Sequence, residues 1–140
     1  MKVVLDTNVL IAAFATQGLC HAVFELCLDQ HQIILSQEIL KEFSDVLEKK
    51  LKMHHSTAKK TTDYLREHAV IHRIKGPYPT ISRDASDDHV LALAEQAAVD
   101  YIITGDEDLL VLSPHGNIPI VQPRQFWEIL KNRENRPRRT

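Results

Sequence analysis

Short apolar segments separated by helix-like stretches are the feature that most constrains this fold. Four of them occupy residues 2–5, 32–35, 101–104 and 118–121, and residues 69–74 are a weaker fifth. Their side chains are apolar at neighbouring positions instead of alternating with polar ones, which is typical of strands buried on both faces of a parallel sheet. We therefore predict an α/β fold, a three-layer α/β/α sandwich with a central, mostly parallel sheet of about five strands.

Helical periodicity fills the intervals between these segments. The clearest helix follows Ser36, which can cap it, and repeats apolar residues at helical spacing from Ile39 to Leu51. A loop is predicted over residues 75–86, and further helices over 9–14, 21–29, 57–68, 88–98, 106–112 and 123–130. Right-handed crossovers then place the carboxyl ends of all parallel strands on one edge, where open α/β sheets bind ligands.

Acidic residues gather at that edge in the predicted topology. Asp6 follows the first strand directly, and Glu42 lies on the helix after the second strand, roughly 40° outside its apolar stripe. The other candidates open the helix 88–98 or follow the strand 101–104: Asp87, Asp88, Asp106 and Asp108. We expect these carboxylates to converge, although each one alone has a simpler explanation as a helix cap, a first-turn acid or a solvated residue.

Carboxylates that converge repel one another and raise each other's pKa unless cations neutralise them. Asp6 is the hardest to explain otherwise, since a carboxylate at the end of a buried strand is costly to desolvate without partners. Four such groups carry a charge of about −4, which two Mg²⁺ ions would balance. Oxygen ligands without Cys or His favour Mg²⁺ or Mn²⁺ over Zn²⁺, so the sequence predicts a magnesium or manganese site.

The length of the chain, 140 residues, is that of a single domain. No apolar run approaches the ~20 residues of a transmembrane helix. Asp6 and Asn8 interrupt the first apolar stretch, which argues against a signal peptide. We expect a cytoplasmic protein without membrane contact, with one domain over residues 1–130 and a basic C-terminal tail over residues 131–140.

Basic residues are concentrated away from these acids. The last ten residues hold five Lys or Arg and one Glu, and a second basic run begins at Lys49. A solvated tail and a solvated helix face explain both runs without any ligand. Weak contacts with the phosphates of a nucleic acid are the alternative, and the candidates for them are Lys49, Lys50, Lys52, Arg133 and Arg136.

Four segments, LDTNVLI, ILKEF, SDDHVLALA and YIITGDEDLL, resemble in their order and spacing the PIN-domain family of Mg²⁺-dependent ribonucleases. The resemblance covers residues 1–130 and is closest to bacterial PIN proteins that are the toxins of toxin–antitoxin pairs. It implies that the family's four acidic positions are Asp6, Glu42, Asp88 and Asp106. One residue of ambiguity remains, because Asp87 competes with Asp88, which we favour since the HVLALA segment after it matches the family's helix.

The same resemblance implies the supporting residues, the chemistry and the partners. Asn8 and Thr104 match polar residues that support the metal site, and Asp108 matches a position that is often acidic. The implied reaction is the hydrolysis of RNA with one or two Mg²⁺ or Mn²⁺ ions, leaving a 5′-phosphate and a 3′-hydroxyl. An antitoxin partner and a homodimer are also implied. His89, although next to the acids, is expected to be structural or solvated.

Other functions stay compatible with parts of the pattern. Asp6 could be the covalent nucleophile of a phosphohydrolase, but that family requires an aspartate two residues later, where this chain has Asn8. A non-catalytic PIN-fold module would bind RNA or protein without turnover, and a structure-specific DNA nuclease would use the same acids. A P-loop nucleotide enzyme is excluded because the sequence lacks GxxxxGK[ST].

Overall fold

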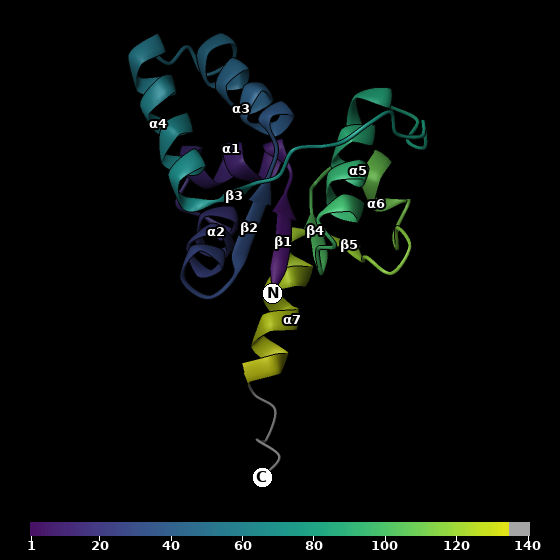
Figure 1. The fold of residues 1–140 in the computed structure, drawn as a ribbon. Coiled ribbons are helices and arrows are strands. Elements are labelled where there is room, and N and C mark those ends of the chain that lie inside the picture. The colour runs from purple at the N-terminus through teal and green to yellow at the C-terminus, as the bar shows by residue number, and fades with distance from the viewer. Residues whose placement is uncertain (135–140) are drawn as a thin grey trace.

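The structure is a computed structural model that describes residues 1–134, and these contain one five-stranded sheet (Figure 1). The strands are β1 (Lys2–Leu5), β2 (Gln32–Leu35), β3 (Val70–Ile71), β4 (Tyr101–Ile103) and β5 (Ile120–Val121). Their order is β3-β2-β1-β4-β5, and every neighbouring pair is parallel. The predicted α/β class with a parallel sheet is confirmed.

The central strand, β1, is apolar on both faces, and Val3, Val4 and Leu5 are fully buried. It pairs with β2 on one side and with β4 on the other. Along the sequence, β2 and β3 lie on one side of β1, and β4 and β5 lie on the other side. The strand order therefore reverses direction at β1. The carboxyl ends of β1 and β4 therefore flank the switch point at which open α/β sheets bind ligands.

Helices cover both faces of the sheet (Figure 1). To one side lie α1 (Thr7–Ala15), α2 (Leu19–Gln30), α3 (Gln37–Lys49) and α4 (His55–His68), and to the other α5 (Asp88–Gln96) and α6 (Glu107–Leu110). A 3₁₀ turn (Ala85–Asp87) precedes α5 at the end of the predicted loop. The last helix, α7 (Pro123–Glu134), packs against α2.

Three elements differ informatively from the prediction. Strand β5 begins at Ile120 instead of residue 118, because Ile118 pairs with His115 in an isolated antiparallel bridge. The third strand has two residues instead of spanning 69–74, because the N–H of Ala69 still donates to the Leu65 carbonyl and ends α4. Helix α7 continues past its predicted end at Leu130, so the predicted tail begins as helix, and residues 135–140 lie outside the described part. Within residues 1–134 no single helix is long and apolar enough to cross a membrane, and α1 and α2 meet that criterion only as a pair bent by 105°.

Helix α3 carries one of the candidate acids to the carboxyl edge of the sheet. The Oγ of Ser36 accepts a hydrogen bond from the Ile39 N–H at 3.2 Å, so the helix begins directly after β2, as predicted. The buried face of the helix consists of Ile39, Leu40, Phe43 and Leu47. Leu51, predicted on the same stripe, follows the helix end and is exposed. Glu42 borders this face and is only half-buried.

Candidate metal centre

Asp6 lies where β1 ends and α1 begins, and its carboxylate joins two neighbouring strand ends. Its Oδ1 accepts the backbone N–H of Thr7 at 2.8 Å, and its Oδ2 accepts the hydroxyl of Thr104, which follows β4, also at 2.8 Å. Burial raises the pKa of Asp6 despite these hydrogen bonds, and the charges of Glu42 and Asp106 raise it further. Asp6 is therefore a buried carboxylate whose negative charge is incompletely compensated.

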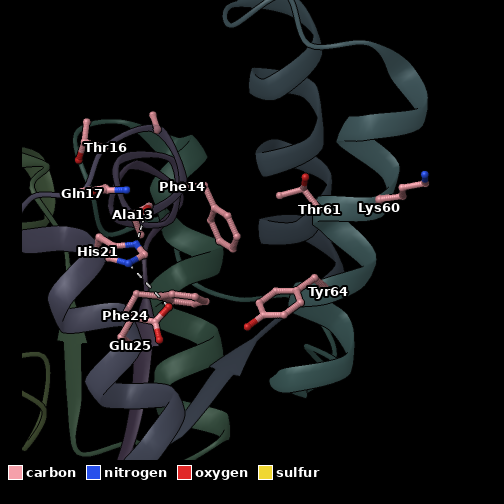
Figure 2. A pocket seen from close by; sticks show the side chains of 11 residues that line it. Ala13, Phe14, Thr16, Gln17, His21, Phe24, Glu25, Lys60, Thr61 and Tyr64 are labelled. Atoms are coloured by element: carbon pink, nitrogen blue, oxygen red, sulfur yellow. Dashed lines mark hydrogen bonds and ion pairs between the residues drawn. The ribbon is translucent and has the colours of Figure 1, made fainter.

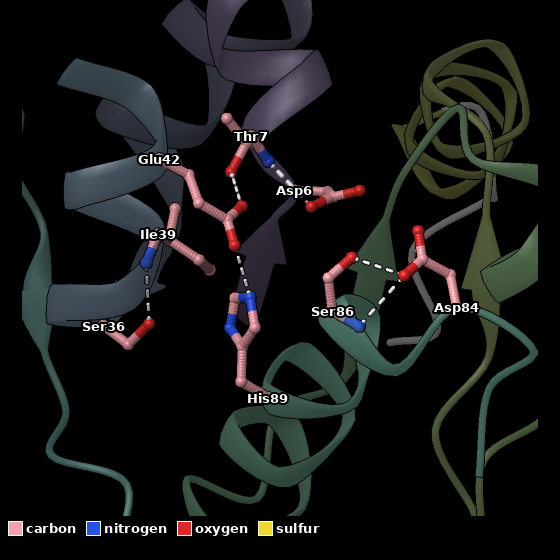
Figure 3. Close-up of polar contacts among 8 residues, drawn as sticks. All are labelled: Asp6, Thr7, Ser36, Ile39, Glu42, Asp84, Ser86 and His89. Carbon is pink, nitrogen blue, oxygen red and sulfur yellow. Dashed lines mark hydrogen bonds and ion pairs between the residues drawn. The ribbon is translucent and has the colours of Figure 1, made fainter. Parts of the chain in front are cut away.

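Glu42 reaches from α3 toward the same strand end (Figure 3). Its Oε2 accepts the hydroxyl of Thr7 at 2.9 Å, and its Oε1 lies 2.7 Å from Nε2 of His89 on α5. Burial alone would raise the pKa of Glu42, but hydrogen bonds from His89 and Thr7 and the charge of the imidazole bring it below the ordinary value. Glu42 is therefore held ionised beside Asp6.

Asp106 and Asp108 follow β4 across a short turn. Asp106 caps α6, because its Oδ1 accepts the N–H of Asp108 at 2.9 Å, and its own N–H donates to the Thr104 hydroxyl at 3.0 Å. The carboxylate of Asp108 accepts a hydrogen bond from Nη2 of Arg83 at 2.6 Å. The capping role expected for Asp106 taken alone is thus present, and it occupies one of the two carboxylate oxygens.

Asp87 precedes α5 without capping it. One carboxylate oxygen each from Asp87, Asp84 and Asp108 lie within 4.8 Å of one another. Oδ2 of Asp87 is buried and has no hydrogen-bond partner among residues 1–134. Burial, then the adjacent Asp106 carboxylate, and then the charges of Asp6 and Asp84 raise the pKa of Asp87 to about 7. Asp87 is therefore the member of the cluster whose ionised form is disfavoured most strongly by its surroundings.

Asp88 has a different set of partners from Asp87. It is buried, and its Oδ1 accepts the backbone N–H groups of Ile81 and Ser82 at 3.0 and 2.8 Å. These bonds fasten the segment before the 3₁₀ turn onto the start of α5. Of the two adjacent aspartates, Asp87, predicted as the alternative to Asp88, lies near Asp6 and Asp106. Asp88 instead hydrogen-bonds to the loop.

The clustered carboxylates outnumber the cationic groups that contact them in the described part of the chain. The six linked carboxylates are Asp6, Glu42, Asp84, Asp87, Asp106 and Asp108. The cationic groups in contact with them in the described part of the chain are the Arg83 guanidinium and, when protonated, the His89 imidazole. An excess of carboxylate oxygens around the unpartnered Oδ2 of Asp87 fits Mg²⁺ or Mn²⁺, which bind oxygen ligands.

Asn8, predicted to support the metal site, and the described candidates for phosphate contacts form no hydrogen bond or ion pair with the clustered carboxylates. Asn8 is exposed on the first turn of α1, and its side chain makes no hydrogen bond among the described residues. Lys49, Lys50 and Lys52 are exposed at the far end of α3. Arg133 lies at the opposite edge of the sheet, where Nη1 contacts Sδ of Met1 at 2.9 Å, and Arg136 is outside the described residues.

Three contributors were not predicted: Thr7, Asp84 and His89. Thr7 stands between the predicted Asp6 and Asn8, and its place at the first position of α1 is the available signal. Asp84 lies in the predicted loop, three residues before Asp87, and only the 3₁₀ turn brings the two together. His89, expected to be structural or solvated, is buried and contacts Glu42, which is compatible with a structural role.

A groove on the described part of the chain is separate from the carboxylates. It lies between α1, α2 and α4 and has a volume of about 640 Å³. Aromatic side chains, among them Phe14, Phe24 and Tyr64, line it together with polar and charged ones. Figure 2 shows Phe14 and Tyr64 facing this groove from opposite sides. None of the six clustered carboxylates lines it.

Solved structures share this fold at low sequence identity. VapBC2 from Rickettsia felis, bound to a DNA fragment from its promoter, gives a TM-score of 0.65 at 14% identity over 87% of this chain and 98% of that chain. VapC20 from Mycobacterium tuberculosis, a sarcin–ricin loop cleaving toxin, gives 0.60 at 11% identity over 79% and 95%. FitAcB from Neisseria gonorrhoeae gives 0.55 at 16% identity over 87% and 98%.

Sequence comparison is informative at the level of the family. No curated protein matches the chain. A family model described as a PIN domain matches residues 2–108, which is more than half of the chain. The matched region extends from β1 into the start of α6 and includes all six clustered carboxylates.

Proposed function

The chain belongs to the PIN-domain family, and from this premise we propose that it is a Mg²⁺- or Mn²⁺-dependent endoribonuclease, the toxin of a toxin–antitoxin pair. The observation that carries the proposal is the convergence, at the switch point of the sheet, of Asp6, Glu42, Asp87 and Asp106. Such an anionic site would repel an RNA phosphate by itself, so a divalent cation must mediate between the two.

Asp6, Asp87 and Asp106 are our proposed metal ligands, with Glu42 binding directly or through water. The choice of Asp87 over Asp88 is supported by the unpartnered Oδ2 of Asp87 and by the two loop N–H groups that Asp88 already accepts. Asp88 then has a structural part in the site. Asp108 lies with Asp84 beside Asp87 and is proposed to support the ligands from outside.

A bound Mg²⁺ or Mn²⁺ supplies a water of lowered pKa and neutralises charge on the scissile phosphate, whose in-line hydrolysis leaves a 5′-phosphate and a 3′-hydroxyl. The chain's own residues prepare the site. Thr7 and Thr104 restrain both oxygens of Asp6, so this carboxylate holds one orientation. Asp87, with a pKa of about 7, must release its proton to act as a ligand. No histidine or serine nucleophile is required.

RNA cleavage by single variants tests this assignment. We expect Asp6→Asn and Asp87→Asn to lower the rate by about 10²-fold or more, the size of effect produced by removing a key electrostatic group. Asp88→Asn keeps an acceptor oxygen for the loop and should retain most of the activity. The matched control is Asp29→Asn, an exposed acid at the end of α2. Cleavage by Asp6→Asn at the wild-type rate would refute the proposed function.

The substrate and partners are tested by separate measurements. A panel of RNA, single-stranded DNA and flap DNA distinguishes the ribonuclease from a DNA nuclease, and Mn²⁺ binding without any cleavage would favour a non-catalytic module. Replacing Lys49, Lys50 and Lys52 with glutamine should reduce the salt dependence of RNA binding if they contact phosphates. An antitoxin, a homodimer and a cytoplasmic location stay predictions from the family resemblance, and light scattering of the purified chain tests the homodimer.

A further inference from the structure

Glu42 is restrained at both of its oxygens by groups from two other elements. Thr7, at the start of α1, donates to Oε2 at 2.9 Å, and His89, on the first turn of α5, lies 2.7 Å from Oε1 through Nε2 (Figure 3). A carboxylate acceptor requires a donor, so Nε2 of His89 carries a proton in this contact. Each oxygen of Glu42 has about two lone-pair sites, so one on each oxygen stays available for a further ligand.

The His89 contact crosses the sheet. Helix α3 lies on one side of the strands and α5 on the other (Figure 1). The imidazole of His89 and the carboxylate of Glu42 meet between these two helices (Figure 3). The two residues are 47 positions apart in sequence. The hydrogen bond therefore joins the two halves of the fold at the candidate metal centre.

Packing alone does not explain a histidine at this position. His89 is 7% exposed, and its Nδ1 is buried without a hydrogen-bond partner among the described residues. An apolar side chain of similar size would fill the same space without burying an unpaired nitrogen. The unpaired Nδ1 costs free energy, and this cost occurs at a position where Nε2 of the same ring contacts Glu42.

We propose that His89 is a positioning residue that, together with Thr7, fixes the Glu42 carboxylate for binding of the divalent metal ion. This inference rests on the proposed function, because it assigns Glu42 to the metal centre. Groups that hydrogen-bond to a metal ligand orient it, and their loss typically weakens metal binding by about 10–100-fold. His89 acts through Glu42 and does not itself touch the metal or the RNA.

The test is Mn²⁺ affinity, measured by electron paramagnetic resonance on the full-length protein. His89→Leu removes the donor and should weaken Mn²⁺ binding by about 10–100-fold. His89→Gln offers an amide N–H at a similar reach and should recover most of the affinity, whereas the shorter His89→Asn should not. Circular dichroism and amide NMR spectra identify any variant that fails to fold. If His89→Leu fails to fold, the comparison of Mn²⁺ affinity between His89→Gln and His89→Asn still tests the inference.

A double-mutant cycle distinguishes positioning from a general structural effect. In the background of Glu42→Gln, His89→Leu should cause little further loss of Mn²⁺ affinity, because the residue that it positions is already altered. Equal affinities of wild type and His89→Leu would overturn the inference, as would the same loss in both backgrounds or no recovery in His89→Gln. These results leave the proposed function intact if Asp6→Asn abolishes cleavage, whereas a wild-type chain that binds no Mn²⁺ overturns both.

Discussion

Replacing Asp87 with asparagine removes the most perturbed carboxyl group of the cluster. The pKa of Asp87 is raised from 3.8 to about 7, first by burial and then by the adjacent Asp106 and the charges of Asp6 and Asp84. Within this window the folded chain keeps a proton that the unfolded chain has released. The contribution of Asp87 to the free energy of unfolding of the metal-free protein therefore falls as the pH rises from about 4 to about 7.

The magnitude follows from the size of the pKa shift. About three pKa units correspond to about 4 kcal/mol. Because Asp87 is only partly buried, solvent screening reduces this to about 1–2 kcal/mol. Asparagine has nearly the same shape without the charge, so metal-free Asp87→Asn should be about 1–2 kcal/mol more stable than wild type at pH 8 and about equally stable near pH 4.

Urea denaturation followed by circular dichroism, in the presence of a chelator and across this pH range, measures the difference. Asp29→Asn, at an exposed position outside the cluster, is the matched control and should follow wild type. At pH 8 added Mg²⁺ should stabilise wild type more than Asp87→Asn, since a ligand that binds the folded state raises its stability. The reasoning fails if Asp87→Asn loses as much stability between pH 4 and pH 8 as wild type does.

Three further variants and one titration probe neighbouring features. Asp88→Ala leaves the buried N–H of Ser82 and the partly buried N–H of Ile81 without their acceptor and should cost about 1–3 kcal/mol in the same urea experiments. Arg83→Gln removes an exposed ion pair, so stability should change by less than about 1 kcal/mol, while calorimetry should show tighter Mn²⁺ binding because a competing cation is gone. Phe43→Ala, in the core, should cost about 3–5 kcal/mol. Wild-type Mn²⁺ affinity should rise from pH 6 to pH 8 as Asp87 releases its proton, and a flat profile would contradict its role as a ligand.

The fold was predictable because its signal is local. A strand buried on both faces must be apolar at consecutive positions, and β1, β2 and β4 satisfy this within runs of three or four residues. The approach of Asp6 to Thr104 and Asp106 follows from the same pattern, since adjacent parallel strands bring their carboxyl ends together. The positions of strands β3 and β5 were predicted, but their predicted lengths were too great. The start of β3 depends on where helix α4 ends, and the extent of both strands depends on pairing with the neighbouring strands.

The choice between Asp87 and Asp88 depended on a contact that is invisible along the chain. Neighbouring residues at the start of a helix point about 100° apart, so only one of the pair can face the cluster. The backbone of Ile81 and Ser82 folds back onto Asp88, and the 3₁₀ turn leaves Asp87 beside Asp84 and Asp106.

By itself the sequence determined the parallel sheet and the edge at which the acids gather, because neighbouring residues carry both the apolar pattern of the strands and the acids that follow the strand ends. Only the tertiary structure decided which aspartate of the doublet faces that edge and that His89 meets Glu42 there. Both outcomes depend on side chains that the packing of α3 and α5 around the sheet brings together. The spacing of residues along the chain does not determine which side chains of two distant helices come into contact.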